Sequence, residues 1–382
     1  MIKNIKNGIN KKFILIISLS LVAILLLAGI IFIYGLYSKI FNNSIPIIER
    51  TEDYVIDNTP PEDIVKASDE DVQQAAEDIP ADENGEQAAV DPITEEPKTD
   101  SETDNNNDSS DDYTYASPTK EIPIYKKEQI NKDVLNILLL GRDSRDPANY
   151  RGRTDSMIVL SYNKNKGTAT LLSLQRDSLI PIEDHGWNRI NTSYFFGGVG
   201  LCINTINDVF DLDIQNYAVV DFNGIVDIIN KIGGVEVTLT KAEADYYNKS
   251  IGSTLTEGKN LLNGEQALVH SRNRTTGTDY DFGRARRQRD VLFTIYNKCI
   301  KIKDFSTITS LIEFGLTKVS TNLTPDFIYT MAREVINSTT PPMLKAEHMP
   351  FTGTWESAWY KKMLILKIDI KENTRLIHEL LY

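Results

Sequence analysis

Two acidic residues follow apolar runs near the middle of the chain. Asp143 comes just after Gly141, which closes the apolar run 134–140, and Asp155 comes just before the apolar run 157–162. Ends of neighbouring strands can bring two such carboxylates to one point. A pair of carboxylates with open positions suits Mg²⁺, or Mn²⁺ in its place, because such ions also take up phosphate oxygens. The simpler interpretation, that both residues cap turns, stays open.

A second group of charged residues lies at the start of a predicted helix. At the helical period of about 3.6 residues, Arg284, Gln288 and Val291 share the face turned toward the core, and Arg286 points elsewhere. A buried guanidinium needs a fixed anion. For Arg284 that anion is either Asp281, about one turn earlier, or a phosphate, which a helix N-terminus also favours. The guanidinium fork fits phosphate better than a lysine does.

Other candidate residues stand alone in the sequence. Arg153 precedes Asp155, Arg176 follows the apolar run 168–174, and Arg272 follows a predicted helix. Arg189 and Asn191 would add a cation and an amide ahead of a Gly-Gly pair. The four histidines show no metal-ligand spacing, and there is no Gly-x-Ser-x-Gly, Walker or Cys-x-x-Cys motif.

Alternating apolar segments predict the elements that position these residues. The pattern predicts strands over 134–140, 157–162, 168–174, 217–221, 235–239 and near 344–349. It predicts helices over 199–210, 222–232, 264–271, 284–300 and 373–381, and two more after residue 300. Strands that alternate with helices favour an α/β fold, here a mixed-sheet α-β-α sandwich.

The N-terminal part predicts a membrane anchor. Residues 13–38 contain no charged side chain, which is enough apolar chain to cross a bilayer. Lys11 and Lys12 precede this run and place residues 1–12 in the cytoplasm and the rest of the chain outside. A cleaved signal peptide is the alternative, but its apolar core would be shorter.

The charge is concentrated in the middle of the chain. The net charge is −13, and residues 41–132 carry 25 acidic against seven basic side chains. Low hydrophobicity with high charge predicts a disordered acidic linker over 39–132. The domain that follows, 133–382, is charge-balanced, which argues against nucleic acid as a partner. The two cysteines, Cys202 and Cys299, either form one disulfide or remain free thiols, as buried cysteines often do.

A series of motifs over 134–300 resembles the LytR-CpsA-Psr family. The matching segments, in chain order, are Asn136-Ile-Leu-Leu-Leu-Gly-Arg-Asp143-Ser-Arg145, Gly152-Arg-Thr-Asp155, Leu172-Ser-Leu-Gln-Arg176-Asp177, Arg189-Ile-Asn191, Gly233-Gly234-Val-Glu-Val237, Leu262-Asn-Gly-Glu-Gln-Ala-Leu268 and Asp281-Phe-Gly-Arg284 with Arg287-Gln288. The resemblance implies a membrane-anchored phosphotransferase of the cell envelope. Such enzymes move a glycopolymer, for example teichoic acid or capsule, from a polyprenyl-pyrophosphate carrier onto peptidoglycan. The lipid tail of such a carrier would need an apolar groove, which helices 199–210, 222–232 and 284–300 could line.

Each site residue that the resemblance implies has a counterpart here. Asp143 and Asp155 would hold Mg²⁺, while Arg153, Arg176, Arg272 and Arg284 would clamp the pyrophosphate, assisted by Gln288. Asp281 would belong to the catalytic cluster with Arg272 and Arg284, and Arg189 and Asn191 would bind substrate. Departures from the family pattern are mild: Gln175 before Arg176, Arg189 for a lysine, and His270-Ser271 for an apolar pair.

Three matters stay open at this point. Either Asp281 or Asp177 would serve as general base. A polyprenyl-pyrophosphate hydrolase would use the same site with water as acceptor. A non-catalytic, lipid-binding regulatory protein would keep the arginines and transfer nothing.

Overall fold

The computed structural model describes five stretches of the chain: residues 44–51, 54–77, 121–142, 154–277 and 279–382. The predicted anchor 13–38 lies outside these stretches, as do Asp143 and Arg153. None of the helices within the five stretches is long and apolar enough to cross a membrane.

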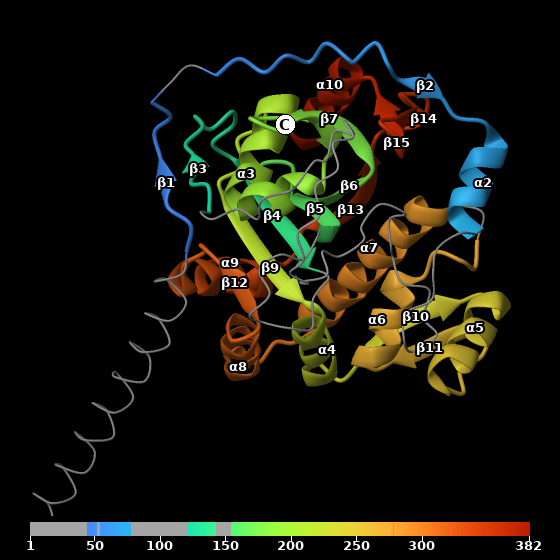
Figure 1. Ribbon diagram of the computed structural model, residues 1–382. Helices are drawn as coiled ribbons and strands as arrows, with labels where there is room; N and C mark the ends of the chain where they lie inside the picture. Colours follow the sequence, from blue (N-terminus) through green and yellow to red (C-terminus); the bar gives the residue numbers. More distant parts are fainter. Residues whose placement is uncertain (1–43, 52–53, 78–120, 143–153, 278) are drawn as a thin grey trace, which may run out of the picture. The chain divides into compact units, whose positions relative to one another are not determined.

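A six-stranded mixed sheet forms the centre of the domain (Figure 1). Its strands, in spatial order, are β12 (Val319–Thr321), β9 (Asn216–Asp221), β4 (Val134–Arg142), β5 (Thr154–Asn163), β6 (Thr168–Leu174) and β13 (Met343–Met349). β9 runs parallel to β4 and β13 parallel to β6, whereas β5 is antiparallel to both of its neighbours. The continuous apolar runs of β4 and β5 fit a sheet that is covered on both faces.

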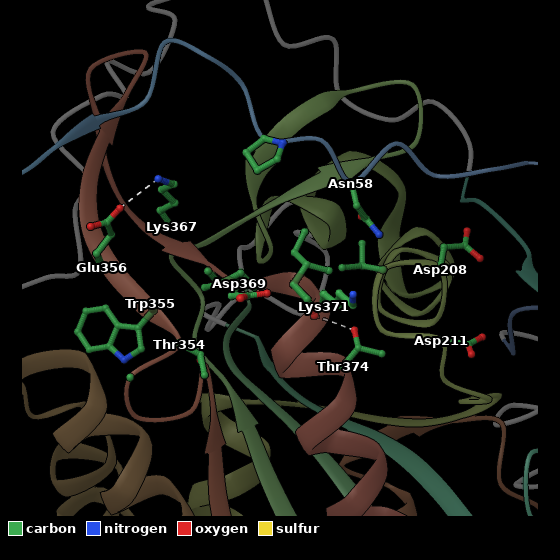
Figure 2. A pocket seen from close by; sticks show the side chains of 15 residues that line it. Asn58, Asp208, Asp211, Thr354, Trp355, Glu356, Lys367, Asp369, Lys371 and Thr374 are labelled. Atoms are coloured by element: carbon green, nitrogen blue, oxygen red, sulfur yellow. Dashed lines mark hydrogen bonds and ion pairs between the residues drawn. The ribbon is translucent and has the colours of Figure 1, made fainter.

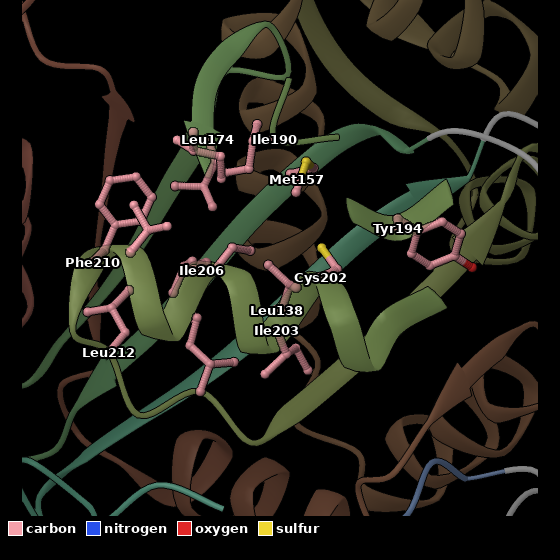
Figure 3. Packing of buried hydrophobic residues seen from close by; sticks show 14 of the residues in the cluster. Leu138, Met157, Leu174, Ile190, Tyr194, Cys202, Ile203, Ile206, Phe210 and Leu212 are labelled. Atoms are coloured by element: carbon pink, nitrogen blue, oxygen red, sulfur yellow. The ribbon is translucent and has the colours of Figure 1, made fainter. Parts of the chain in front are cut away.

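Two helices close one face of this sheet. α3 (Thr192–Phe210) and α10 (Ile370–Leu381) pack against it and form the largest core (Figure 3). In this core Leu138 and Leu172 from the sheet meet Ile203 and Ile206 of α3, all with no exposed surface. This face is therefore filled by the protein's own side chains, and the lipid groove expected along helix 199–210 stays a prediction.

The remaining large helices lie on the other side. α7 (Tyr280–Cys299) crosses β6 and β13. A second core joins α4 (Phe222–Lys231), α5 (Lys241–Ile251), α6 (Gly264–Arg272) and the hairpin of β10 (Val235–Leu239) and β11 (Gly258–Leu262). α8 (Phe305–Leu316) and α9 (Pro325–Asn337) complete this side. The structure thus confirms the predicted mixed α/β fold.

A second sheet was not predicted. It contains, in order, β2 (Val65–Lys66), β14 (Trp355–Tyr360), β15 (Met363–Ile368), β7 (Ser178–Ile182) and β8 (Gly186–Arg189). β15 pairs with β7 directly after Asp177. This sheet therefore supports the residues that follow β6.

Part of the predicted linker 39–132 is folded. We call residues 44–51 and 54–66 the strap. Ile45 is buried in the main core, and β1 (Ile47–Ile48) pairs with β3 (Ile124–Tyr125). Arg50 donates hydrogen bonds to Asp208 and Glu183. A short acidic helix, α2 (Asp69–Glu77), follows the strap.

The linker prediction is therefore wrong for the strap, α2 and residues 121–132. Strand pairing and apolar anchors offset the cost of ordering a polar segment. The remainder of the predicted linker, residues 39–43, 52–53 and 78–120, lies outside the described residues. Cys202 and Cys299 are both free thiols, so no disulfide joins them.

Candidate functional site

Three carboxylates meet where β5, β6 and α7 converge. Asp155 belongs to β5, Asp177 follows β6, and Asp281 lies in the first turn of α7. Arg176 joins them: its Nη1 is 2.9 Å from Asp155 Oδ1, and its Nε is 2.8 Å from Asp281 Oδ2 and 3.3 Å from Asp177 Oδ2. One guanidinium thus fixes side chains from two strand ends and a helix N-terminus.

Two further arginines close around the same carboxylates. Arg274 Nε is 3.1 Å from Asp281 Oδ1, and Arg274 Nη2 is 3.6 Å from Asp155 Oδ2. Arg284 lies 3.5 Å from Asp155 Oδ2 through Nη1 and 3.4 Å from Asp281 Oδ2 through Nη2. Both arginines therefore bridge Asp155 and Asp281.

Arg189 completes the group from the side of Asp177. Its Nε is 3.4 Å from Asp177 Oδ1, and its Nη2 donates a 2.7 Å hydrogen bond to the carbonyl of Leu364 in β15. We refer to the whole group as the carboxylate–arginine cluster. Its members are Asp155, Asp177, Asp281, Arg176, Arg189, Arg274 and Arg284.

Some nitrogens of this cluster donate no hydrogen bond within the described residues, although two of them make the longer ion-pair contacts to Asp155. Arg284 is only 4% exposed, yet its Nε and Nη1 have no hydrogen-bond partner there, and neither has Nη2 of Arg274. A buried donor without a partner costs roughly 1–3 kcal/mol, and more when it is charged. An anion bound between Arg274 and Arg284 would satisfy these groups.

The two neighbouring carboxyls Asp177 and Asp281 differ in acidity. Burial raises the pKa of Asp281, and the charge of Asp177 adds to the rise, while Arg176 and Arg274 oppose it. Burial alone would also raise the pKa of Asp177. The charges of Arg176 and Arg189 nevertheless hold the pKa of Asp177 well below its usual range. Asp281 is therefore the better proton acceptor of the two.

Several predicted site residues take supporting places. Asn191 is buried beside the backbone of Arg176, and its Oδ1 has no hydrogen-bond partner in the described part of the chain. Gln288 is half-buried one turn beyond Arg284. The guanidinium of Arg272 lies over the ring of Phe222, 4.7 Å from its centre.

Sequence reasoning missed two arginines. Arg274, two residues beyond Arg272, reaches Asp155 and Asp281, and the only available signal was its place in the Arg-Asn-Arg segment. Arg142, at the end of β4, is buried 3.6 Å from Asp221. A buried-strand pattern gives no hint that an arginine at its end faces inward.

The predicted metal site is described only in part. Asp155 presents two carboxylate oxygens, of which Oδ1 accepts a hydrogen bond from Arg176. Oδ2 has only the longer contacts to Arg274 and Arg284 within the described residues, which leaves it suited to a hard cation. No group of three or more His, Cys, Asp or Glu residues that could hold a metal occurs in the portions described. Asp143, the second predicted ligand, lies outside them.

A separate hollow of about 800 Å³ lies between the strap, the end of α3, the β14–β15 pair and the start of α10 (Figure 2). No member of the carboxylate–arginine cluster lines it. Its lining carries four carboxylates, Asp208, Asp211, Glu356 and Asp369, against two lysines, and Lys367 already pairs with Glu356 at 3.1 Å. The hollow lacks the chemistry of a phosphate site, which the cluster has.

The cluster can perform one kind of chemistry well. Several guanidinium forks in fixed positions bind phosphate oxygens and neutralise charge that develops on them. A carboxyl with a raised pKa beside them can accept a proton from a hydroxyl. These features suit transfer of a phosphoryl group.

Solved structures share this fold at low sequence identity. B. subtilis TagV aligns with a TM-score of 0.55 at 23% identity, over 66% of this chain and 98% of that one. A structure of TagT bound to LIIa-WTA aligns with a TM-score of 0.54, also at 23% identity, over 70% of this chain and 95% of that one.

Sequence comparison identifies closer relatives. The polyisoprenyl-teichoic acid–peptidoglycan teichoic acid transferase TagU of Enterococcus faecalis is 30% identical over 262 residues, which is 67% of this chain and 82% of the relative. TagU of Bacillus licheniformis is 34% identical over 51% of this chain and 62% of its own length. The model of the LytR_cpsA_psr family matches residues 98–375. The chain therefore belongs to the LytR-CpsA-Psr family.

Proposed function

We propose that this protein is a phosphotransferase of the cell envelope that attaches a glycopolymer, carried on a polyprenyl pyrophosphate, to peptidoglycan. The observation that carries the proposal is the pair of buried arginines, Arg274 and Arg284, with unused donors in the described residues. The relatives named as teichoic acid transferases make a teichoic acid or a similar polymer the expected cargo.

In this reaction a sugar hydroxyl of peptidoglycan attacks the phosphorus that carries the glycopolymer. A new P–O bond forms while the bond to the bridging pyrophosphate oxygen breaks, and polyprenyl phosphate leaves. The hydroxyl proton passes to Asp281, whose raised pKa suits this role. Arg176, Arg274 and Arg284 neutralise the charge that grows on the leaving phosphate.

Arg153, Arg189, Asn191, Gln288 and Arg272 would complete the substrate-binding shell. Asp143 and Asp155 would hold Mg²⁺, or Mn²⁺ in its place. The ion would supply further positive charge next to the pyrophosphate. Its presence would also explain why Asp155, already beside three arginines, keeps one oxygen without a short contact in the described residues.

The polyprenyl chain would lie beneath α8 and α9. α9 buries none of its residues, and α8 buries only Ile308 and Leu316. Half-exposed apolar side chains on these helices, on α4 and on the second half of α7 leave apolar surface free. A lipid chain would cover that surface, which water solvates poorly.

Membrane attachment rests on the apolar run 13–38. The full chain should stay with washed membranes, and a chain that lacks residues 1–43 should be released from them. Release of the full chain would reject the anchor without affecting the transferase proposal.

The transfer reaction itself is tested with the full chain in detergent. The assay contains a polyprenyl-pyrophosphate saccharide, a peptidoglycan oligosaccharide and Mg²⁺, with mass spectrometry of the products. We expect a phosphodiester-linked adduct and polyprenyl phosphate, and loss of both with chelator. Release of saccharide phosphate without adduct would identify a hydrolase, and binding without any product would favour the regulatory alternative.

A further inference from the structure

A buried ion pair lies outside the carboxylate–arginine cluster, next to the loop that carries Arg274. Arg287 of α7 and Glu243 of α5 meet at 2.7 Å, with side chains 4% and 9% exposed. Neither residue belongs to the cluster. Such a pair is costly to desolvate and needs fixed geometry to be tolerated.

Arg287 uses its remaining nitrogens on the loop 273–277, which carries Arg274. Its Nη1 donates to the carbonyl of Asn273 at 3.0 Å, and its Nη2 donates to Thr276 Oγ1 at 3.2 Å. These two partners lie on either side of Arg274. One guanidinium therefore holds the loop both before and after the arginine that bridges Asp155 and Asp281.

The loop also closes on itself. Asn273 Oδ1 accepts from the backbone nitrogen of Thr275 at 2.9 Å, and Asn273 Nδ2 donates to Thr276 Oγ1 at 2.6 Å and to the Tyr247 hydroxyl at 3.0 Å. Tyr247 in turn contacts His270 Nδ1 at 3.0 Å. The loop is thus held by side chains from α5, α6 and α7 rather than by strand pairing.

Glu243 is itself fixed in place. Its Oε2 accepts from the backbone nitrogen of Thr240 at 2.8 Å and so completes the capping box of α5, while its Oε1 receives Arg287. A carboxylate that performs both tasks cannot swing away without uncapping the helix. The direction of the Arg287 fork is therefore determined by α5.

We propose that Arg287, held by Glu243, is a positioning residue of the transferase: it sets loop 273–277 so that Arg274 meets the pyrophosphate. This role rests on the proposed function, because it assigns the pyrophosphate to Arg274. A site misplaced by about 1 Å can lose roughly a hundredfold in rate. A residue that fixes the position of Arg274 would therefore affect the rate of transfer. Lysine cannot replace Arg287, since one ammonium cannot reach three partners in the geometry of the fork.

A double-mutant cycle on the full chain in detergent tests this proposal. The variants are Arg287→Lys, Arg274→Ala and the double variant, and the probe is inorganic pyrophosphate, with affinity measured by calorimetry. We expect each single change to weaken binding about tenfold, and Arg287→Lys to add no more than about twofold once Arg274 is absent. Arg286→Lys, on the exposed face of the same helix, serves as the matched control and should bind like the unchanged protein. Losses that multiply to about a hundredfold in the double variant would show that Arg287 does not act through Arg274, and would overturn the proposal.

Hydrogen exchange provides a measurement that does not depend on the function. Amides of loop 273–277 should exchange at least about tenfold faster in Arg287→Lys, with the rest of the domain unchanged. Unchanged protection of the loop would also overturn the proposal. If the unchanged protein neither binds pyrophosphate nor transfers a polymer, the proposed function fails, and exchange still decides whether Arg287 orders the loop. Should Arg287→Lys not fold, Glu243→Gln removes the charge but keeps an acceptor for the fork, and the same cycle applies.

Discussion

Arg284 is more deeply buried than the other arginines of the cluster, and it also has unused donors in the described chain. If those donors bind the pyrophosphate, Arg284→Ala should lower kcat/KM for polymer transfer by about 10²–10³-fold, the scale of one lost transition-state donor. Arg284→Lys should recover little, because a point charge does not reproduce the fork. Steady-state assays with the synthetic lipid substrate give both values.

Arg286 supplies the comparison for that experiment. Its side chain is 54% exposed and pairs with Asp279, so Arg286→Ala should change kcat/KM by less than about twofold. Thermal melts must accompany the assays. An Arg284→Ala protein that melts earlier but keeps full activity while folded would assign Arg284 a structural role only.

The raised pKa of Asp281 predicts that kcat depends on pH. Because its pKa is raised and the base must be ionised to accept a proton, kcat should fall as the pH drops through that raised pKa. The fall should therefore begin above about pH 4, where an ordinary aspartate would titrate. A pH profile of kcat measures this limb, and Asp281→Asn should lower the rate and remove the limb. Persistence of the same limb in Asp281→Asn would assign the proton to another group.

The sequence predicted those members of the cluster that lie on regular elements. Asp155 follows from an apolar run, because a strand end fixes where the adjoining residue lies, whereas Arg176 was assigned to the site only through the family resemblance. Arg284 follows from helical periodicity, which is why its burial was predictable. Arg274 lies in a loop held by side-chain hydrogen bonds from three helices, and no periodicity encodes such a loop.

At the level of elements, α3 depends on a close approach of the chain at Gly200. A β-carbon added there would lie 1.8 Å from the carbonyl oxygen of Ile122. Gly200→Ala should therefore lower the free energy of unfolding by about 3 kcal/mol, the upper range of overpacking costs. Chemical denaturation measures the change.

Gly315 provides a matched helical glycine. It lies in α8, and an added β-carbon would meet nothing within 4 Å. Gly315→Ala should leave stability unchanged or raise it by up to about 1 kcal/mol, because alanine is the better helix former. Equal losses at both positions would mean that the contact with Ile122 is not the cause.

Most strands of the central sheet and the helices α4, α6 and α7 were predictable within a few residues, while α5, β11, the second sheet and the strap were not. β14 contains Glu356 and Ser357, which interrupt its apolar pattern, whereas β15 is a six-residue strand, apolar but for one lysine, that was not predicted. The strap has the composition of a disordered segment. It folds only because distant residues, such as Asp208 and Glu183 for Arg50, provide its partners.

At the level of the whole molecule, the domain begins at Ile45 and not after residue 132. The chain is in contact with the core at Ile45 and again at Ile124 of β3. Residues 78–120 therefore connect two points that are both part of the folded domain. They cannot serve as the only covalent tether of the domain, as the linker prediction required.

The pairing of β1 with β3 and the bonds of Arg50 make this domain a natural candidate for fragment complementation. A single cut between residues 78 and 120 leaves an N-terminal piece that contributes the strap and a C-terminal piece that contains the cluster. We expect the two pieces to separate on a denaturing gel yet to migrate together on a native gel and keep transferase activity. Arg50→Ala, which removes the bonds to Asp208 and Glu183, should let the cut pieces part at a lower urea concentration. If the pieces with Arg50 unchanged separate in native buffer, the expectation is contradicted. If they stay together, the N-terminal part can be exchanged between chains without refolding the catalytic part.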